Sequence, residues 1–120
     1  MLAGSPRSTP CLFGYNDAMQ KKNVRDAADD FAVLNTGRQT QTAVMRLEPG
    51  QTSGALGNEH APSDQVLYVV TGEVVGEVGS ETETLREGDA VIVPAGVPHQ
   101  FRNESSKPAV TLNVYSPPAY

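Results

Sequence analysis

Short segments that are apolar, or that alternate between apolar and polar residues, follow one another along the chain from Phe31 onward. They are rich in Val, Thr, Leu and aromatic residues, which fit a pleated sheet, and several alternate with the period of two that is typical of strands. Turn signals containing Gly, Pro, Asn or Ser separate the segments. Strands are therefore expected at residues 31–36, 41–47, 65–71, 73–79, 81–86, 89–94, 99–103 and 109–115.

The spacing of these segments, roughly 8 to 12 residues per strand, predicts a β-sandwich or β-barrel. No long amphipathic helical pattern interrupts them, so we expect an all-β, single-domain protein. Two segments, VLYVV at residues 66–70 and AVIV at residues 90–93, are apolar at consecutive positions, so both of their faces need cover. One face can line a barrel interior, and the other needs a second sheet or a second subunit. A homodimer is therefore expected.

The beginning of the chain has a different pattern. Gly and Pro punctuate residues 1–18, which show no periodicity. We expect residues 1–22 to form an N-terminal extension that is partly disordered or packed on a partner, and residues 23–120 to form the barrel domain. Residues 23–30 are expected to make a short helical turn with Asn23 as its cap.

Composition and charge narrow the class of function. Of the 120 residues, 38% are hydrophobic and 19% are charged, as in a globular soluble protein. The net charge of −5 disfavours a nucleic-acid partner, and no apolar stretch is long enough to cross a bilayer. Cys11 is the single cysteine, which excludes an intramolecular disulfide. The first residues lack the basic and apolar regions of a secretory signal, so a cytoplasmic protein is expected.

The stretch GDAVIVPAGVPHQFRN, residues 88–103, carries the most specific signal in the chain. It resembles the second conserved motif of the cupin family, in which Gly, Pro, Gly, His and Asn stand at fixed spacing. The positions that fill this motif are Gly88, Pro94, Gly96, His99 and Asn103. The resemblance implies the cupin-type double-stranded β-helix, a jelly-roll barrel with a site in its interior.

The first cupin motif is present in a variant form. Gly72 fits its last position, and counting back places Gln65 in the slot that the family fills with Glu. His60 falls in the second His slot, and Asn58 replaces the first His. The chain contains two histidines, and both occupy ligand slots of the family.

The resemblance implies a divalent transition metal such as Zn, Mn, Fe or Ni, bound by His60, His99, Gln65 and Asn58. Imidazole nitrogen suits Zn, Fe or Ni, and carbonyl oxygen suits harder ions such as Mn. This ligand set is neutral, so we expect weaker binding than in a member with Glu. If a carboxylate replaces Gln65, Asp64 is the first alternative and Glu59 the second.

Two functions follow from this interpretation. The first is a metal-binding cupin that binds or acts on a small polar metabolite inside the barrel, by oxygenase, isomerase or lyase chemistry. The second is a cupin that has lost its metal and serves as a small-ligand-binding or sensor module. In that case Gln65 and Asn58 belong to an amide network that keeps the pocket hydrogen-bonded. Asn103 is expected to stabilise a turn, and Phe101 to line the core and pocket.

Overall fold

The computed structural model describes residues 18–54, 56–57 and 61–120, and this part of the chain is built almost entirely of antiparallel strands. The elements are η2 (Val24–Asp26, a 3-10 turn), β1 (Phe31–Thr36), β2 (Gln41–Leu47), β3 (Asp64–Thr71), β4 (Glu73–Val78), β5 (Glu81–Arg86), β6 (Ala90–Val93), β7 (His99–Arg102) and β8 (Ala109–Ser116). Within these residues no helix is long and apolar enough to cross a membrane.

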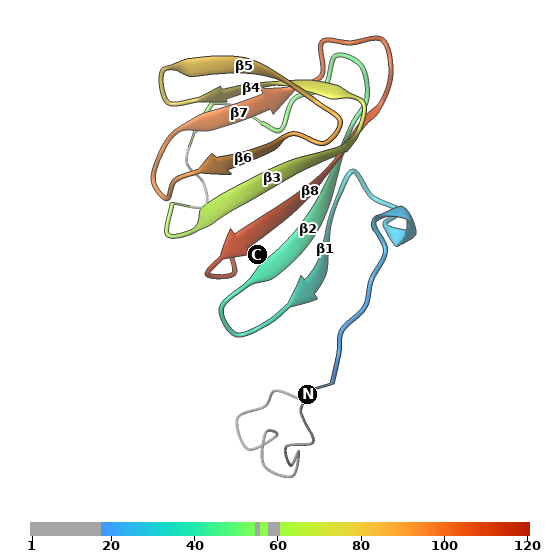
Figure 1. Cartoon of the computed structure of the whole chain (residues 1–120), viewed down its shortest axis with the longest axis vertical. Helices are drawn as coiled ribbons and strands as arrows, with labels where there is room; N and C mark the ends of the chain where they lie inside the picture. The colour runs from blue at the N-terminus through green and yellow to red at the C-terminus, as the bar shows by residue number, and fades with distance from the viewer. Residues whose placement is uncertain (1–17, 55, 58–60) are drawn as a thin grey trace.

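The strands form two sheets that enclose a shared core (Figure 1). The larger sheet has the order β1-β2-β8-β3-β6, and the smaller has the order β5-β4-β7. In Figure 1 the smaller sheet lies at one end of the molecule, and the strands of the larger sheet follow one another away from it. This arrangement is the double-stranded β-helix that the sequence predicted.

Each expected strand is present, and its ends lie within one residue of the expected position. The predicted cap is also confirmed, because the Asn23 side chain accepts a hydrogen bond of 2.9 Å from the Arg25 amide at the start of η2. The strands could be located from the sequence because residues of one face of a strand pack inward and their neighbours face outward. On β8, for example, every second residue from Ala109 to Tyr115 is buried.

The core combines apolar side chains from the inner faces of both sheets. The buried cluster consists of Met45, Leu47, Leu67, Val69, Val74, Leu85, Val93, Phe101 and Ala109. Gly72 lies where the backbone must come close to this cluster. A Cβ atom on Gly72 would stand 2.5 Å from the Pro108 carbonyl oxygen, and its φ of 81° also favours glycine. The last position of the first motif is therefore architectural.

Asn103, the last residue of the second motif, stabilises a turn as predicted. Its side chain is 1% exposed, and its Nδ2 donates to the carbonyls of Leu47 (2.9 Å) and Lys107 (2.7 Å). Its Oδ1 accepts from the amide and the hydroxyl of Ser105. These bonds tie the end of β2 to the loop that follows β7.

Candidate functional site

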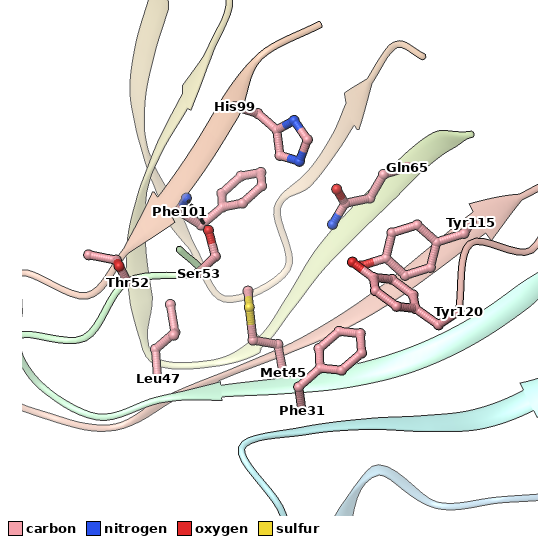
Figure 2. Close-up of a pocket in the computed structure, with 10 residues that line it drawn as sticks. All are labelled: Phe31, Met45, Leu47, Thr52, Ser53, Gln65, His99, Phe101, Tyr115 and Tyr120. Atoms are coloured by element: carbon pink, nitrogen blue, oxygen red, sulfur yellow. Dashed lines mark hydrogen bonds between the residues drawn. The ribbon is translucent and has the colours of Figure 1, made fainter. Parts of the chain in front are cut away.

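A cavity of about 270 Å³ opens between the two sheets at the end of the barrel where β3 and β7 begin (Figure 2). Its walls combine apolar, aromatic and polar side chains. The lining residues are Phe31, Met45, Leu47, Thr52, Ser53, Gln65, His99, Phe101, Tyr115 and Tyr120. In Figure 2, His99 and Gln65 project into the cavity from opposite sheets and point toward one another.

The turn between β6 and β7 places His99 at this cavity. β6 ends at Val93, before Pro94, whose carbonyl accepts a turn hydrogen bond of 3.1 Å from the Val97 amide. Gly96 in this turn has a φ of 82°, which glycine adopts without strain. β7 then begins at His99, and alternation directs both His99 and Phe101 inward, as the sequence predicted.

A hydrogen bond to the backbone orients the His99 imidazole. Its Nδ1 atom lies 2.9 Å from the Val97 carbonyl oxygen, which can only accept, so Nδ1 carries the proton in the neutral ring. Nε2 then carries the lone pair, which is the tautomer that ligates a metal through Nε2. The His99 backbone pairs with Gly57 in an isolated bridge, with hydrogen bonds of 2.9 and 3.3 Å.

Gln65 faces His99 from β3 and is 3% exposed. Its Nε2 donates a hydrogen bond of 3.1 Å to the Oδ1 of Asn113. Its Oε1 is buried without a hydrogen-bond partner among the described residues. A buried acceptor without a donor costs free energy, on the order of 1–3 kcal/mol. Its position at the cavity shows where a cation or a hydrogen-bond donor would be stabilised.

The remaining candidate ligands do not line the cavity in the part of the chain that the structure describes. Asp64 is exposed, and its Oδ1 accepts a hydrogen bond of 2.8 Å from the Ala95 amide instead of lining the cavity. The structure thus brings Gln65 to the cavity and leaves Asp64 outside it. Asn58, His60 and Glu59 lie outside the described residues.

The charged side chains that the structure describes on and beside β7 do not line the cavity. Arg102, which follows Phe101 on β7, contacts Glu104 at 2.6 Å and Glu77 at 3.3 Å. The hydrogen bond to Glu104, together with the charge of both glutamates, raises the pKa of Arg102. Within the described residues no three His, Cys, Asp or Glu side chains converge as a metal site would require. Among the described residues that line the cavity there is no Asp, Glu, Lys or Arg.

Sequence reasoning missed an aromatic wall on one side of the cavity. The Tyr120 ring packs against Phe31 (4.9 Å between centroids) and Tyr115 (5.1 Å). Gln41 positions Tyr120, because its Oε1 accepts from the amides of Ala119 (3.0 Å) and Tyr120 (2.8 Å) and its Nε2 donates to the Tyr120 carbonyl (2.7 Å).

The sequence held one signal for this arrangement. Gln41 stands at an inward-facing position of a strand whose other inward positions are apolar. A buried glutamine requires hydrogen-bond partners. The alternation did not reveal that those partners come from the distant end of the described chain.

The fold and the cavity together define a small β-barrel protein with a cavity between its two sheets. The chain belongs to the cupin family, since the sequence model described as "Cupin domain" matches residues 43–115, which is more than half of the chain.

Relatives and solved structures agree with this assignment. An uncharacterized protein of Streptomyces coelicolor, SCO3923, is 39% identical over 77% of this chain and 86% of the relative. The crystal structure of TT1209 from Thermus thermophilus superposes with a TM-score of 0.72 at 35% identity, covering 82% of this chain and 98% of TT1209. A structure from Silicibacter pomeroyi, described as a sugar phosphate isomerase from a cupin superfamily, has a TM-score of 0.62 at 29% identity, covering 74% of this chain and 60% of that one.

Proposed function

We propose that this cupin binds a divalent transition metal between His99 and Gln65, and that a small polar metabolite binds beside the metal in the same cavity. The observation that carries this proposal is the buried Gln65 Oε1, which lacks a donor among the described residues and faces His99 across the cavity. A metal ion satisfies such an oxygen, and the protonated Nδ1 of His99 prepares its Nε2 as the second donor.

Asn58 and His60 complete the proposed ligand set by their positions in the variant first motif. Gly57, the residue before Asn58, is bridged to His99, which supports this part of the proposal. When bound, a divalent metal polarises a substrate oxygen or lowers the pKa of a bound water. The cavity volume of about 270 Å³ limits the ligand to a small metabolite.

The reaction and the kind of ligand can be proposed more specifically. The Silicibacter pomeroyi structure is described as a sugar phosphate isomerase, which favours isomerase chemistry on a hydroxylated substrate among the oxygenase, isomerase and lyase alternatives. The aromatic wall of Phe31, Tyr115 and Tyr120 fits the apolar face of such a ligand, while Gln65 and His99 meet its polar groups.

A second candidate function is a metal-free pocket that binds or senses a small ligand. The observation that favours it is the neutral described lining, in which Gln65 is hydrogen-bonded into an amide network. A ligand hydroxyl or ammonium group would then donate to the Gln65 Oε1.

We also propose that the protein is a homodimer joined through the outer face of the larger sheet. Ile92, Val66 and Val114 lie side by side across three adjacent strands of this face, and each is exposed or half-buried. Tyr68 and Leu112 form the neighbouring row. A contiguous apolar sheet surface is typical of an interface, and the same face of a second copy is its self-complementary partner.

Elemental analysis of the freshly purified protein tests the metal proposal. After anaerobic loading with Mn, Fe, Ni or Zn and removal of free metal, we expect stoichiometric metal in the wild type. His99→Ala should lose it because a nitrogen donor is missing, while circular dichroism still reports a folded sheet. Arg102→Ala is the matched control, since it changes an outward-facing side chain of the same strand.

Full occupancy in His99→Ala would exclude this residue as a ligand. Absence of metal from the loaded wild type would instead support the metal-free ligand-binding function.

A further inference from the structure

A second cavity lies on the open side of the barrel, where the two sheets do not pair with one another. β6 is an edge strand of the larger sheet, and β5 is an edge strand of the smaller one. Between them lies a cavity of about 440 Å³, which we call the edge cavity. Its volume falls within the range of about 300–1,000 Å³ that is typical of small-molecule sites. Neither His99 nor Gln65 lines it, so it is distinct from the cavity that the cupin motifs define.

The floor of the edge cavity is apolar and continuous with the core. Val78 of β4, Leu85 of β5 and Val91 of β6 line it, and each belongs to the buried cluster or packs against it. Val97, from the turn before β7, adds a fourth apolar side chain. Apolar ligand surface that contacts such residues is removed from water, which is favourable. The floor therefore favours a ligand with a hydrocarbon body.

Two carboxylates stand at the mouth of the edge cavity. Glu81 and Glu83 line it and are exposed to solvent. Alternation on β5 puts them on the same face as the buried Leu85, and residues two apart on a strand are separated by about 6.5–7 Å, so one ammonium group can contact both carboxylates. Within the described part of the chain, neither carboxylate makes a hydrogen bond or an ion pair.

The arginines of the smaller sheet pair with other glutamates. The strands of this sheet contain two arginines, and both face its outer side. The Nε of Arg86 lies 3.6 Å from Glu73, and the Nη1 of Arg102 lies 3.3 Å from Glu77. Among the described residues that line the edge cavity there is no Lys, Arg or His. The negative charge at its mouth is therefore complementary to a cation that these residues do not supply.

We propose that the edge cavity is a second binding site, for a small organic cation with an apolar body and no anionic group. Its ammonium group lies between Glu81 and Glu83, and its hydrocarbon part lies on the floor. Exposed ion pairs contribute little free energy, so the floor supplies most of the affinity and the carboxylates supply the selectivity for charge. An inorganic cation gains nothing from the floor, and an anionic group is repelled at the mouth. This site is independent of the metal proposed between His99 and Gln65.

Three hexyl compounds that differ in charge test this site. Hexylammonium, hexanol and hexanoate are titrated at constant ionic strength into the ¹⁵N-labelled full chain, and the backbone amide shifts are followed by NMR. We expect hexylammonium to cause saturable shifts at residues 78–85 and 91–97, and to bind about 2- to 10-fold more tightly than hexanol, as one or two exposed ion pairs provide. Hexanoate should bind more weakly than hexanol. The amides of Tyr115 and Tyr120, which line the other cavity, should not shift.

Two double variants with the same change of charge separate this site from the general attraction of a protein with a net charge of −5. Glu81→Gln combined with Glu83→Gln removes both carboxylates at exposed positions, so the sheet should stay folded, and hexylammonium should bind no more tightly than hexanol. Glu73→Gln combined with Glu87→Gln removes two carboxylates outside the edge cavity, and hexylammonium affinity should stay within about twofold of the wild type.

Equal losses in the two double variants would show attraction by net charge alone and would overturn the inference. Equal affinities for hexylammonium and hexanoate, or the absence of saturable shifts at residues 78–85, would overturn it as well.

Discussion

At the scale of single residues, the unusual feature of the site is an amide where the family places a carboxylate. Gln65 keeps the position and the inward direction of that ligand, because alternation on β3 places it in the cavity beside the buried Leu67 and Val69. It supplies an oxygen but no charge. A divalent ion held by neutral ligands keeps its full charge in a partly desolvated cavity, so we expect the proposed ligand set to bind it less tightly than a set with a carboxylate.

Gln65→Glu restores the carboxylate and should raise Zn²⁺ affinity by about tenfold or more, because one negative charge offsets half of the charge of the ion. The metal-free variant should be less stable than the wild type, since the buried carboxylate lacks a cation. Isothermal titration and urea denaturation measure the two effects.

Asp64→Asn is the control for this change. It removes a carboxylate from the adjacent residue, whose side chain is exposed and bonded to the Ala95 amide. Its Zn²⁺ affinity should equal that of the wild type. A loss of affinity in Asp64→Asn, without a gain in Gln65→Glu, would show that Asp64 is the ligand.

At the scale of elements, side-chain hydrogen bonds join distant segments around the cavity. The Asn103 side chain ties β2 to the loop after β7, and Gln41 ties the start of β2 to residues 119–120. Gln41 is 1% exposed and also donates to the Thr36 hydroxyl at 3.0 Å. Each link satisfies buried polar groups that water cannot reach, and each places a wall of the cavity.

Gln41→Leu removes the side-chain hydrogen bonds to Thr36, Ala119 and Tyr120, so we expect a loss of about 1–3 kcal/mol in the free energy of unfolding. Urea denaturation measures this loss. Thr36→Val removes one partner of Gln41 and should cost about 0.5–1.5 kcal/mol. A smaller loss in Gln41→Leu than in Thr36→Val would contradict the view that Gln41 holds residues 119–120 in place.

At the scale of the whole molecule, the two faces of the larger sheet differ in what they contact. The inner face carries the core and the site, and the outer face presents Val66, Ile92 and Val114 side by side. From the consecutive apolar positions at residues 66–70 and 90–93, the sequence predicted that both faces of these strands need cover. The register of the strands then shows that the outward residues form one surface instead of scattered positions.

Ile92→Glu places a charge in the centre of this surface and should shift the proposed dimer toward single chains. Ile92 is 64% exposed, so the single chain itself should remain folded. Sedimentation equilibrium measures the mass. Thr84→Glu, at an exposed position of β5 in the smaller sheet, is the control and should leave the mass unchanged. A wild-type mass equal to one chain would refute the homodimer.

The fold and part of the site were predictable because both depend on local patterns. The period of two located the strands, and the fixed spacing from Gly88 to Asn103 located the turn that directs His99 inward. Gly72 matched the last position of the first motif, and counting back along the same strand gave Gln65. The spacing to Gly72 also favoured Gln65 over Asp64, and on β3 Gln65 is buried while Asp64 is exposed.

Contacts between segments far apart in the chain were decided only by the tertiary structure. The pairing of Gln65 with Asn113, the packing of Tyr120 on Phe31, and the link from Gln41 to residues 119–120 join positions about 50 to 90 residues apart. Periodicity describes which side of a strand a residue faces, but it contains no information on which strand lies beside it. That choice comes from the closure of the barrel, which places Asn113 beside Gln65 at the cavity.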